Sequence, residues 1–499
     1  MKKTKILAYM LAAAVAISGY HNTTAAYAAA LDEYSISSTT TQDEPKNPPP
    51  HGKPPMGPPP NGERPPQAPP NGAPPNGQLP NGNSPDGAPG GFGGPGSSGE
   101  VKYSATTEIT SAADKINEQY TADTKEQSAL IISTKDKVQL INPTISKTGD
   151  SDGRDNCNFY GQNATVLVKG GTTTTIIGGT ITSNAEGANG VFSYGGNGGQ
   201  NGAAGDGTRV IIKDTKITTS GSGSGGIMTT GGGITEAYNL DITTNGQSSA
   251  PIRSDRGGGT VIVDGGHYVS NGLGSPTIYS TADITVSNAT LESTLSEGVC
   301  IEGLNSITLN NCSMTANNTG RNAKATFHDM IMLYQSFSGD ADRGTSCFNV
   351  NGGSLTNKNG HVFHVTNTNA VINLNNTKIT NLDAKNVLLS VCNDGWSGGS
   401  NIATINASQQ KMSGDILVGD NSKLTLNLRE GTAYAGSING NIINAKGETV
   451  STKTGEVNLS IDDTSTWTLT GDAYVTSFTG NKANIIKNGH NLYVNGEKW

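Results

Sequence analysis

Short runs of β-branched and aliphatic residues recur along the chain, separated by Asn, Gly, Ser and Thr. The clearest pair is DITVSNATLES at 283–293 and SITLNNCSMTA at 306–316, which begin 23 residues apart. Within each run apolar and polar positions alternate, which is typical of a strand with one buried face. From about residue 127 to 415, this pattern predicts many short strands at a repeating phase.

Each repeat contains three strands. Two successive units place them at 260–265, 266–271 and 277–281, and then at 283–288, 289–294 and 299–303. Close units are 23 to 26 residues apart, and wider intervals indicate inserted loops. Three strands and three turns per unit predict an all-β fold, a right-handed, single-stranded parallel β-helix whose coils stack at about 4.8 Å. An antiparallel sandwich also uses short strands but would not keep this phase.

The flanking regions differ from the repeats. A basic start, MKKTK, precedes the apolar run ILAYMLAAAVAIS and small residues, which indicates a signal peptide at 1–28 because the run is too short to span a membrane. A Tyr at position 20, where a lipoprotein signal needs Cys, argues against a lipid anchor. Nineteen of the 22 prolines lie between Pro45 and Pro95, so residues 29–100 are expected to be a disordered Pro/Gly-rich spacer.

The other domain boundaries follow from changes in charge and strand length. Residues 101–126 are more charged and are expected to form an N-terminal cap, as a strand or short helix that covers the open end of the solenoid. The β-helix is expected at 127–414. Residues 415–499 carry longer strands and Trp467, and are expected to continue the helix and taper into a C-terminal cap. We expect a monomer that is secreted and associated with the cell surface.

Composition narrows the classes of partner. The formal net charge is −8, and no Lys/Arg cluster occurs beyond the first five residues, which argues against nucleic acid or an anionic membrane as partner. Gly accounts for 67 of 499 residues and aromatic residues for 5%, which suits tight corners around a narrow core. The five cysteines match no zinc pattern; they are interpreted as free thiols in strands, with one disulfide between neighbouring coils as the alternative.

Aligning the third strands in phase predicts an exposed surface. If Val191, Ile227, Ile252, Ile278 and Val299 point inward, two outward columns arise. The first holds Phe192, Met228, Arg253, Tyr279 and Cys300; the second holds Tyr194, Thr230, Asp255, Thr281 and Glu302, with Tyr334 as an extension. Aromatic rings beside charged groups suit a sugar, so we predict ligand binding by Phe192, Tyr194, Arg253, Asp255, Arg256, Tyr279, Glu302 and Tyr334. The alternative is an ordinary solvated sheet face.

Three other groups of residues carry side chains that could form a site. SDRGGG (254–259) and ADRGTS (341–346) each place Arg beside Asp, which fits a charge pair at a corner or, alternatively, a base or calcium site for polyuronate cleavage. In GDSDGRDN (149–156), Asp150, Asp152 and Asp155 could bind calcium, although the full calcium-loop register is missing. His361 and His364 are expected on opposite strand faces, which argues against a shared metal.

The rungs GSPTIYSTADITVSNATL and SEGVCIEGLNSITLNNCSMTANN resemble secreted right-handed β-helix proteins of anaerobic, largely Gram-positive bacteria. Some of these are adhesin-like, and one group is a calcium-associated carbohydrate-binding family with a polysaccharide-lyase-like fold. The resemblance covers roughly residues 105–499. Pectate lyases share the coil but carry WIDH-type and RxPxxR segments, and polygalacturonases carry NTD, GHG and RIK; this chain contains none of them.

Three functions remain open. We favour non-catalytic glycan binding or adhesion, in which an exposed parallel sheet binds a polysaccharide or a host or cell-surface glycan, with calcium as the only cofactor considered and no catalytic residue assigned. The second is a polysaccharide lyase or glycoside hydrolase acting on acidic or plant-type polysaccharide, with an Arg and carboxylates near Asp255 and Asp342. The third is a structural surface protein. Fold alone does not decide between them.

Overall fold

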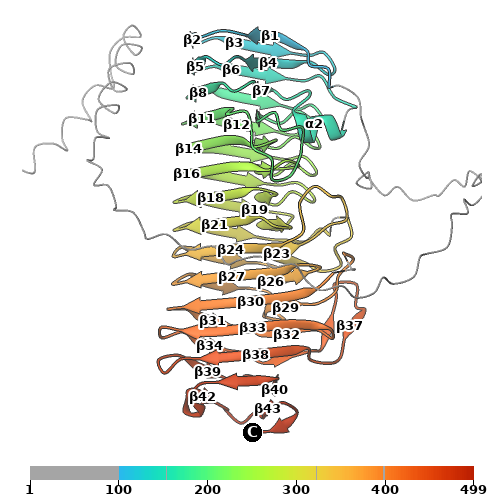
Figure 1. The fold of residues 1–499 in the computed structure, drawn as a ribbon, viewed down its shortest axis with the longest axis vertical. Helices are drawn as coiled ribbons and strands as arrows, with labels where there is room; N and C mark the ends of the chain where they lie inside the picture. Colours follow the sequence, from blue (N-terminus) through green and yellow to red (C-terminus); the bar gives the residue numbers. More distant parts are fainter. Residues whose placement is uncertain (1–100, 153, 322, 397–398) are drawn as a thin grey trace, which may run out of the picture. The chain divides into compact units, whose positions relative to one another are not determined.

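The computed structural model describes residues 101–152, 154–321, 323–396 and 399–499. This part of the chain is a parallel β-helix, which confirms the predicted fold class; the coils stack along one axis from β1 to β43 (Figure 1). The predicted signal peptide (1–28) and spacer (29–100) lie outside the described residues.

Two large parallel sheets run the length of the stack. Sheet A, with 13 strands, is formed by the third strand of each coil. Its strands are β1 (Ala105–Ile109), β4 (Ser128–Ser133), β7 (Val166–Lys169), β10 (Val191–Tyr194), β13 (Ile227–Thr230), β15 (Ile252–Ser254), β17 (Ile278–Ser280), β20 (Val299–Glu302), β23 (Asp329–Tyr334), β26 (His361–Thr366), β29 (Val387–Val391), β32 (Asp415–Val418) and β35 (Ile438–Asn439).

Sheet B, with 22 strands, combines the upstream and second strands of the coils. They join because β14 and β16 run unbroken through the corner between the two rows. Its strands are β2 (Ala113–Ile116), β3 (Gln119–Ala122), β5 (Lys137–Ile141), β6 (Thr144–Lys147), β8 (Thr173–Ile177), β9 (Thr180–Ser183), β11 (Arg209–Lys213), β12 (Lys216–Thr219), β14 (Gly233–Thr244), β16 (Gly259–Ser270), β18 (Asp283–Ser287), β19 (Thr290–Ser293), β21 (Ser306–Asn310), β22 (Ser313–Ala316), β24 (Thr345–Asn351), β25 (Ser354–Asn357), β27 (Asn369–Asn375), β28 (Lys378–Asn381), β30 (Asn401–Ser408), β33 (Ser422–Arg429), β38 (Glu456–Ile461) and β41 (Ser477–Thr479).

The remaining elements are short. Among the described residues they are the helices α2 (Arg154–Tyr160) and η1 (Lys482–Asn484) and the strands β31 (Lys411–Ser413), β34 (Ala433–Ala435), β36 (Ile442–Ile443), β37 (Thr449–Ser451), β39 (Thr466–Thr468), β40 (Ala473–Val475), β42 (Ile485–Ile486), β43 (Leu492–Val494) and β44 (Glu497–Lys498).

The repeat in the sequence is the repeat of the coil. Ile284 pairs with Ile307 and Val286 with Leu309, so residues 23 apart become neighbours in sheet B. These side chains are buried in the lumen with their counterparts from the other strand rows. The alternation that identified each strand therefore also marks which side chains form the common core.

The corners explain the asparagines and glycines. Asn239, Asn288 and Asn311 occupy equivalent corners of sheet B with φ of 52°, 55° and 53°, a left-handed conformation that Asn tolerates better than most residues. At another corner the coils approach so closely that a Cβ on Gly246 would lie 1.9 Å from the carbonyl oxygen of Gly221. Such a contact is impossible, so this corner requires glycine.

Buried hydroxyl groups satisfy backbone donors next to that glycine corner. The backbone N–H of Ser224 donates to Ser249 Oγ at 2.9 Å, and the N–H of Ser249 donates to Ser275 Oγ at 2.8 Å. All three serines are fully buried. The ladder provides hydrogen bonds for amide groups that would otherwise be buried without partners.

Strands occupy the segment that was expected to be an N-terminal cap made of a strand or short helix. Residues 101–126 contain β1, β2 and β3, which form a first coil paired with β4, β5 and β6. In β1 and β2, exposed residues alternate mainly with half-buried ones. This pattern is expected for strands in the first coil of the stack, where one side has no neighbouring coil. At the C-terminal end the coils continue, as predicted, and finish with the antiparallel pair β43–β44.

All five cysteines are free thiols in the structure. Cys157, Cys300, Cys312 and Cys392 are buried and Cys347 is half-buried. The interpretation as free thiols is confirmed, and none of the five forms the alternative disulfide. Only Cys300 (β20) and Cys347 (β24) lie in strands, whereas Cys157 lies in α2 and Cys312 and Cys392 lie just outside strands.

Candidate functional site

The residues predicted to bind a ligand lie together on the outer face of sheet A. The predicted register is confirmed: Phe192 pairs with Met228, Met228 with Arg253, Arg253 with Tyr279 and Tyr279 with Cys300. Glu302 pairs with Tyr334 on the next strand, so the second column continues as predicted.

The prediction that this face is exposed is wrong. Phe192 is 0%, Glu302 1%, Asp255 5% and Tyr334 7% exposed. Three segments between the strands cover the face: α2, residues 195–208 and residues 335–344. Helix α2 is fixed by the Thr230 hydroxyl, which donates to the Phe159 carbonyl at 2.7 Å. The strand phase places these side chains outward, but the inserted loops that fold back over them follow no repeat.

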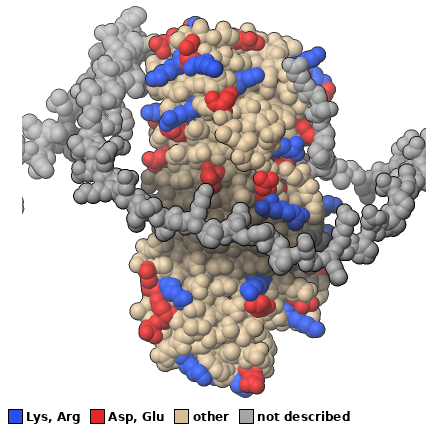
Figure 2. Space-filling model, viewed as in Figure 1, with Lys and Arg blue, Asp and Glu red and all other residues tan. Residues whose placement is uncertain are grey.

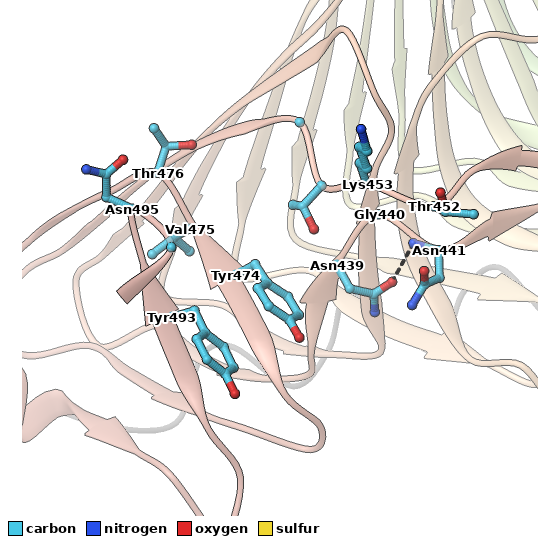
Figure 3. Close-up of a pocket in the computed structure, with 13 residues that line it drawn as sticks. Asn439, Gly440, Asn441, Thr452, Lys453, Tyr474, Val475, Thr476, Tyr493 and Asn495 are labelled. Atoms are coloured by element: carbon cyan, nitrogen blue, oxygen red, sulfur yellow. Dashed lines mark hydrogen bonds between the residues drawn. The ribbon is translucent and has the colours of Figure 1, made fainter. Parts of the chain in front are cut away.

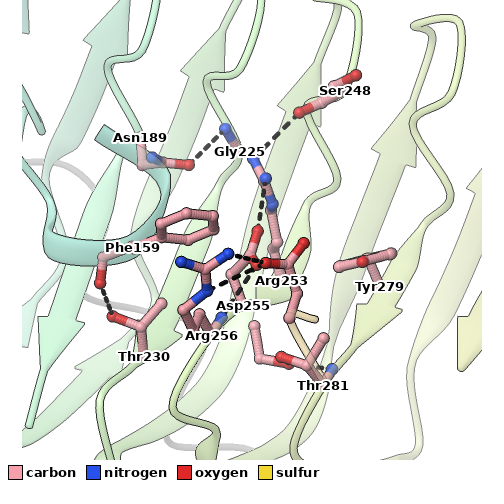
Figure 4. A network of polar contacts seen from close by, with 12 residues as sticks. Phe159, Asn189, Gly225, Thr230, Ser248, Arg253, Asp255, Arg256, Tyr279 and Thr281 are labelled. Carbon is pink, nitrogen blue, oxygen red and sulfur yellow. Dashed lines mark hydrogen bonds and ion pairs between the residues drawn. The ribbon is translucent and has the colours of Figure 1, made fainter. Parts of the chain in front are cut away.

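An arginine–carboxylate network connects this face to one of the covering segments. It consists of Arg253, Asp255 and Arg256, which Figure 4 labels, and Asp340 from the 335–344 segment. Arg253 Nη2 is 2.9 Å from Asp255 Oδ2, and Arg256 Nη2 is 2.6 Å from Asp340 Oδ1. The Arg256 guanidinium also lies 4.0 Å from the ring centre of Phe159. Through its ion pair with Asp340 and its contact with Phe159, Arg256 therefore connects the turn after β15 with the 335–344 segment and with α2.

Of the two DRG segments, only SDRGGG (254–259) forms charge pairs in the described part of the chain: Arg253 pairs with Asp255, and Arg256 pairs with Asp340, which precedes ADRGTS (341–346). Asp342 accepts a hydrogen bond from Asn201 Nδ2 at 3.4 Å and contacts neither arginine in any described ion pair.

Glu302 is the second polar centre of this face. It accepts hydrogen bonds from the hydroxyls of Tyr279 at 2.7 Å and Tyr334 at 3.1 Å, and from Ser336 Oγ. Tyr334 also packs on Trp396, with ring centres 5.1 Å apart. The predicted tyrosines are thus used to hold Glu302 and the 335–344 segment.

Burial changes the acidity of both carboxyl groups. Burial raises the pKa of Asp255 to about 7; Arg253 opposes this shift and the nearby Asp340 adds to it. Burial also raises the pKa of Glu302, against hydrogen bonds from Ser336 and Tyr279 that lower it. Such perturbed groups often mark active sites. Here both side chains are buried, with Asp255 5% and Glu302 1% exposed.

A second buried cluster lies further along sheet A. The prediction that His361 and His364 point to opposite faces is wrong: the Nδ1 atoms of both lie 2.7 Å from Ser390 Oγ. His364 Nε2 is 3.5 Å from Asp394 Oδ2, and both side chains are fully buried. Burial lowers the pKa of His361 to about 3, so this imidazole is neutral. The cluster lies under Phe327, whose ring contacts both histidines, and is closed to ligands.

The structure does not bring the predicted calcium ligands together. Asp150 Oδ1 accepts a hydrogen bond from the backbone of Glu186 at 2.9 Å, Asp152 pairs with Lys125, and Asp155 lies in α2. Within the described ranges, no three or more His, Cys, Asp or Glu side chains form a group that could hold a metal ion.

An open groove lies instead near the C-terminal end of the stack (Figure 3). We call it the tyrosine groove. It has a volume of about 520 Å³ and is lined by Asn439, Gly440, Asn441, Thr452, Lys453, Thr454, Gly455, Tyr474, Val475, Thr476, Tyr493, Asn495 and Gly496.

Its aromatic part is set by strand register. Tyr474 on β40 pairs with Tyr493 on β43, and their rings stack with centres 4.9 Å apart and planes 8° from parallel. Tyr474 is 41% exposed. In the view of Figure 3, Tyr474 stands between Tyr493 and Asn439, so the stacked rings adjoin the amide groups of the groove.

The sequence contained a signal for this groove. AYV at 473–475 and LYV at 492–494 repeat the same pattern 19 residues apart, which places two tyrosines at one phase of successive coils. These two tyrosines lie outside the central repeats whose third strands predicted the ligand-binding face, in the region that was expected to taper into a C-terminal cap.

Figure 2 shows acidic and basic side chains scattered in small mixed groups over one face. No helix in the described part of the chain has both the length and the apolar character needed to cross a membrane. Comparisons with protein-family models, curated proteins and solved structures found no match.

Proposed function

We propose that this is an exported, surface-associated β-helix that binds glycans without catalysis, and that the tyrosine groove is its binding site. The observation that carries the proposal is the stacked, partly exposed pair Tyr474 and Tyr493 beside amide and hydroxyl groups. An aromatic ring covers the apolar face of a sugar, and amides can both donate to and accept from its hydroxyls.

The lining of the groove favours binding over catalysis. The groove-lining residues include no carboxylate, imidazole or thiol. Glycoside hydrolysis ordinarily needs two carboxyl groups, and the carboxylates near Asp255 are buried under loops. Export rests on the signal-peptide pattern at 1–28 and remains part of the proposal.

The test is a glycan array with the mature chain, followed by titration calorimetry with the glycans that bind. Tyr474→Ala should weaken binding at least tenfold, because the sugar loses its stacking surface. Tyr238→Ala is the matched control, since Tyr238 is a half-buried tyrosine on the outer face of sheet B, away from the groove. It should leave affinity unchanged.

Two results would contradict the proposal. Binding to no glycan would remove the function, and release of soluble products from a bound polysaccharide would favour an enzyme. Repeating the array with EDTA tests the calcium expectation: the groove as described needs no metal, so affinity should not change.

A further inference from the structure

The tyrosine groove carries a single formal charge. Of its lining residues only Lys453 is charged; the others offer amides, hydroxyls and backbone groups. Lys453 is exposed and lies in the turn between β37 and β38. Some other lysines of the described chain pair with a carboxylate, such as Lys423, whose Nζ is 2.8 Å from Glu456 Oε1. No described carboxylate forms an ion pair with Lys453.

The position of Lys453 is fixed by its backbone. Ser451 Oγ donates to the Lys453 carbonyl at 3.0 Å and accepts from its N–H at 3.3 Å. The same residue packs against Gly440, where an added Cβ would lie 2.1 Å from the Lys453 carbonyl carbon. The backbone of Lys453 is therefore held in place at the edge of the groove, and only its side chain is flexible.

Lys453 is one of the residues that line the groove, and Figure 3 shows its side chain beside Gly440, with the ammonium directed away from the tyrosine rings in this view. Because the lysine side chain is long and flexible, its ammonium could turn towards a charged substituent on the next sugar of a glycan that is held by Tyr474. Lysine acts there as a mobile point charge with three donors.

We propose that the groove selects glycans that carry carboxylate groups, of the uronic-acid class, and that Lys453 is the residue responsible. This rests on the proposed function, because it names the ligand of the same groove. The net charge of the whole chain is −8, so the protein at large repels an anionic polymer. A preference for acidic glycans would thus have to come from the local, unpaired cation.

The experiment compares pairs of ligands that differ only in charge. Oligouronides of several linkages and their carboxyl-reduced, neutral counterparts are titrated into the mature chain by calorimetry. The oligouronide should bind about fivefold tighter, as expected for one exposed ion pair, and this preference should shrink as salt is raised.

Variants separate the two proposals. Lys453→Gln should remove the preference and leave affinity for the neutral ligand unchanged, whereas Tyr474→Ala should weaken both ligands equally. Lys446→Gln, in the nearby β36–β37 connection but outside the groove lining, is the control and should keep the preference.

The outcomes are distinguishable. Equal binding of both ligands by the wild-type chain, or a preference that survives in Lys453→Gln, overturns the acidic selectivity and leaves glycan binding intact. Binding of neither member of any pair, together with a blank glycan array, overturns both proposals.

Discussion

The outer faces of sheets A and B come from the same coils, yet one is covered and the other is open. On sheet A the outward residues include Phe192 and Met228, both fully buried under inserted segments. On sheet B the outward residues include Thr308, Asn349 and Asn373, which are half-buried. Their side chains form hydrogen bonds from one coil to the next along the stack. The chemistry of an outward column therefore indicates whether loops will cover it.

This difference bears on function. A large apolar side chain in an outward column indicates a second, outer core, whereas a ladder of small polar side chains indicates a surface that water reaches. The aromatic and charged residues of sheet A form contacts within the protein. The tyrosine groove differs from both faces, because it combines stacked aromatic side chains with exposure to solvent: Tyr474 is 41% exposed.

The largest expected effect is a difference in the free energy of unfolding between substitutions on the two faces. Phe192→Ala should lower the free energy of unfolding by about 3–5 kcal/mol, since it empties a buried site. Ile262→Ala, at an outward position of sheet B that is 39% exposed, should cost about 0.5 kcal/mol. Urea unfolding of both variants measures the contrast, and equal losses would mean that sheet A is not covered in solution.

A smaller effect is expected for the ion pair that fastens the cover. Asp340→Ala should cost about 3 kcal/mol, because it leaves Arg256 without its partner in a mostly buried position. The comparison is Asp241→Ala, which breaks the exposed pair with Lys216 and should cost about 1 kcal/mol at most. If the two losses match in urea unfolding, the 335–344 segment is not held by Arg256.

The covered face also predicts a pH dependence. Because the pKa of Asp255 is raised to about 7 in the folded state from an ordinary value of 3.8, the folded protein binds this proton more tightly than the unfolded chain. Its contribution to stability is fully present below about pH 4 and is lost as the pH rises towards 7, by about 1.4 kcal/mol per pH unit at most. Glu302, with its raised pKa, acts in the same direction.

Urea unfolding at several pH values tests this. Asp255→Asn should flatten the decline between pH 4 and 7, and the slope is compared because the substitution changes the absolute stability as well. A slope that is identical in the variant would show that Asp255 does not hold a proton near neutral pH.

The smallest effect is expected on the open face. Asn373 Nδ2 donates to Asn349 Oδ1 at 2.7 Å and Asn373 Oδ1 accepts from Asn406 at 2.8 Å. Asn373→Ala removes both hydrogen bonds at a position where water can replace them. It should therefore lower the free energy of unfolding by only about 1 kcal/mol, measured by urea unfolding. A loss as large as that of Asp340→Ala in the same assay would mean that the ladder is a structural support in its own right.

The fold was predictable because two features of the local sequence determine it: the alternation of apolar and polar residues within each strand and the regular spacing of the strands. The 23-residue spacing of Ile284 and Ile307, and the alternation around them, follow directly from the need of each coil to pair with the next. The same phase correctly aligned Arg253 with Tyr279. Glycine and asparagine corners required no long-range information.

The candidate site was only partly predictable. The position of Asp340 opposite Arg256 depends on how a loop inserted 84 residues later folds back, and no periodicity describes a loop. His361 and His364 converge on Ser390 from the next coil, a partner that alternation within one strand does not reveal. The tyrosine pair did follow the periodic rule, since Tyr474 and Tyr493 share a phase, but its exposure depends on the absence of a covering loop there.

The location of the groove in the last coils has a geometric consequence. Each coil touches only its immediate neighbours, so a homologous chain could gain or lose whole coils without disturbing the rest. Every coil added between the covered segments and Tyr474 would carry the groove about 4.8 Å further along the axis. The number of coils thus sets the distance between the groove and the covered segments, independently of which side chains line the groove.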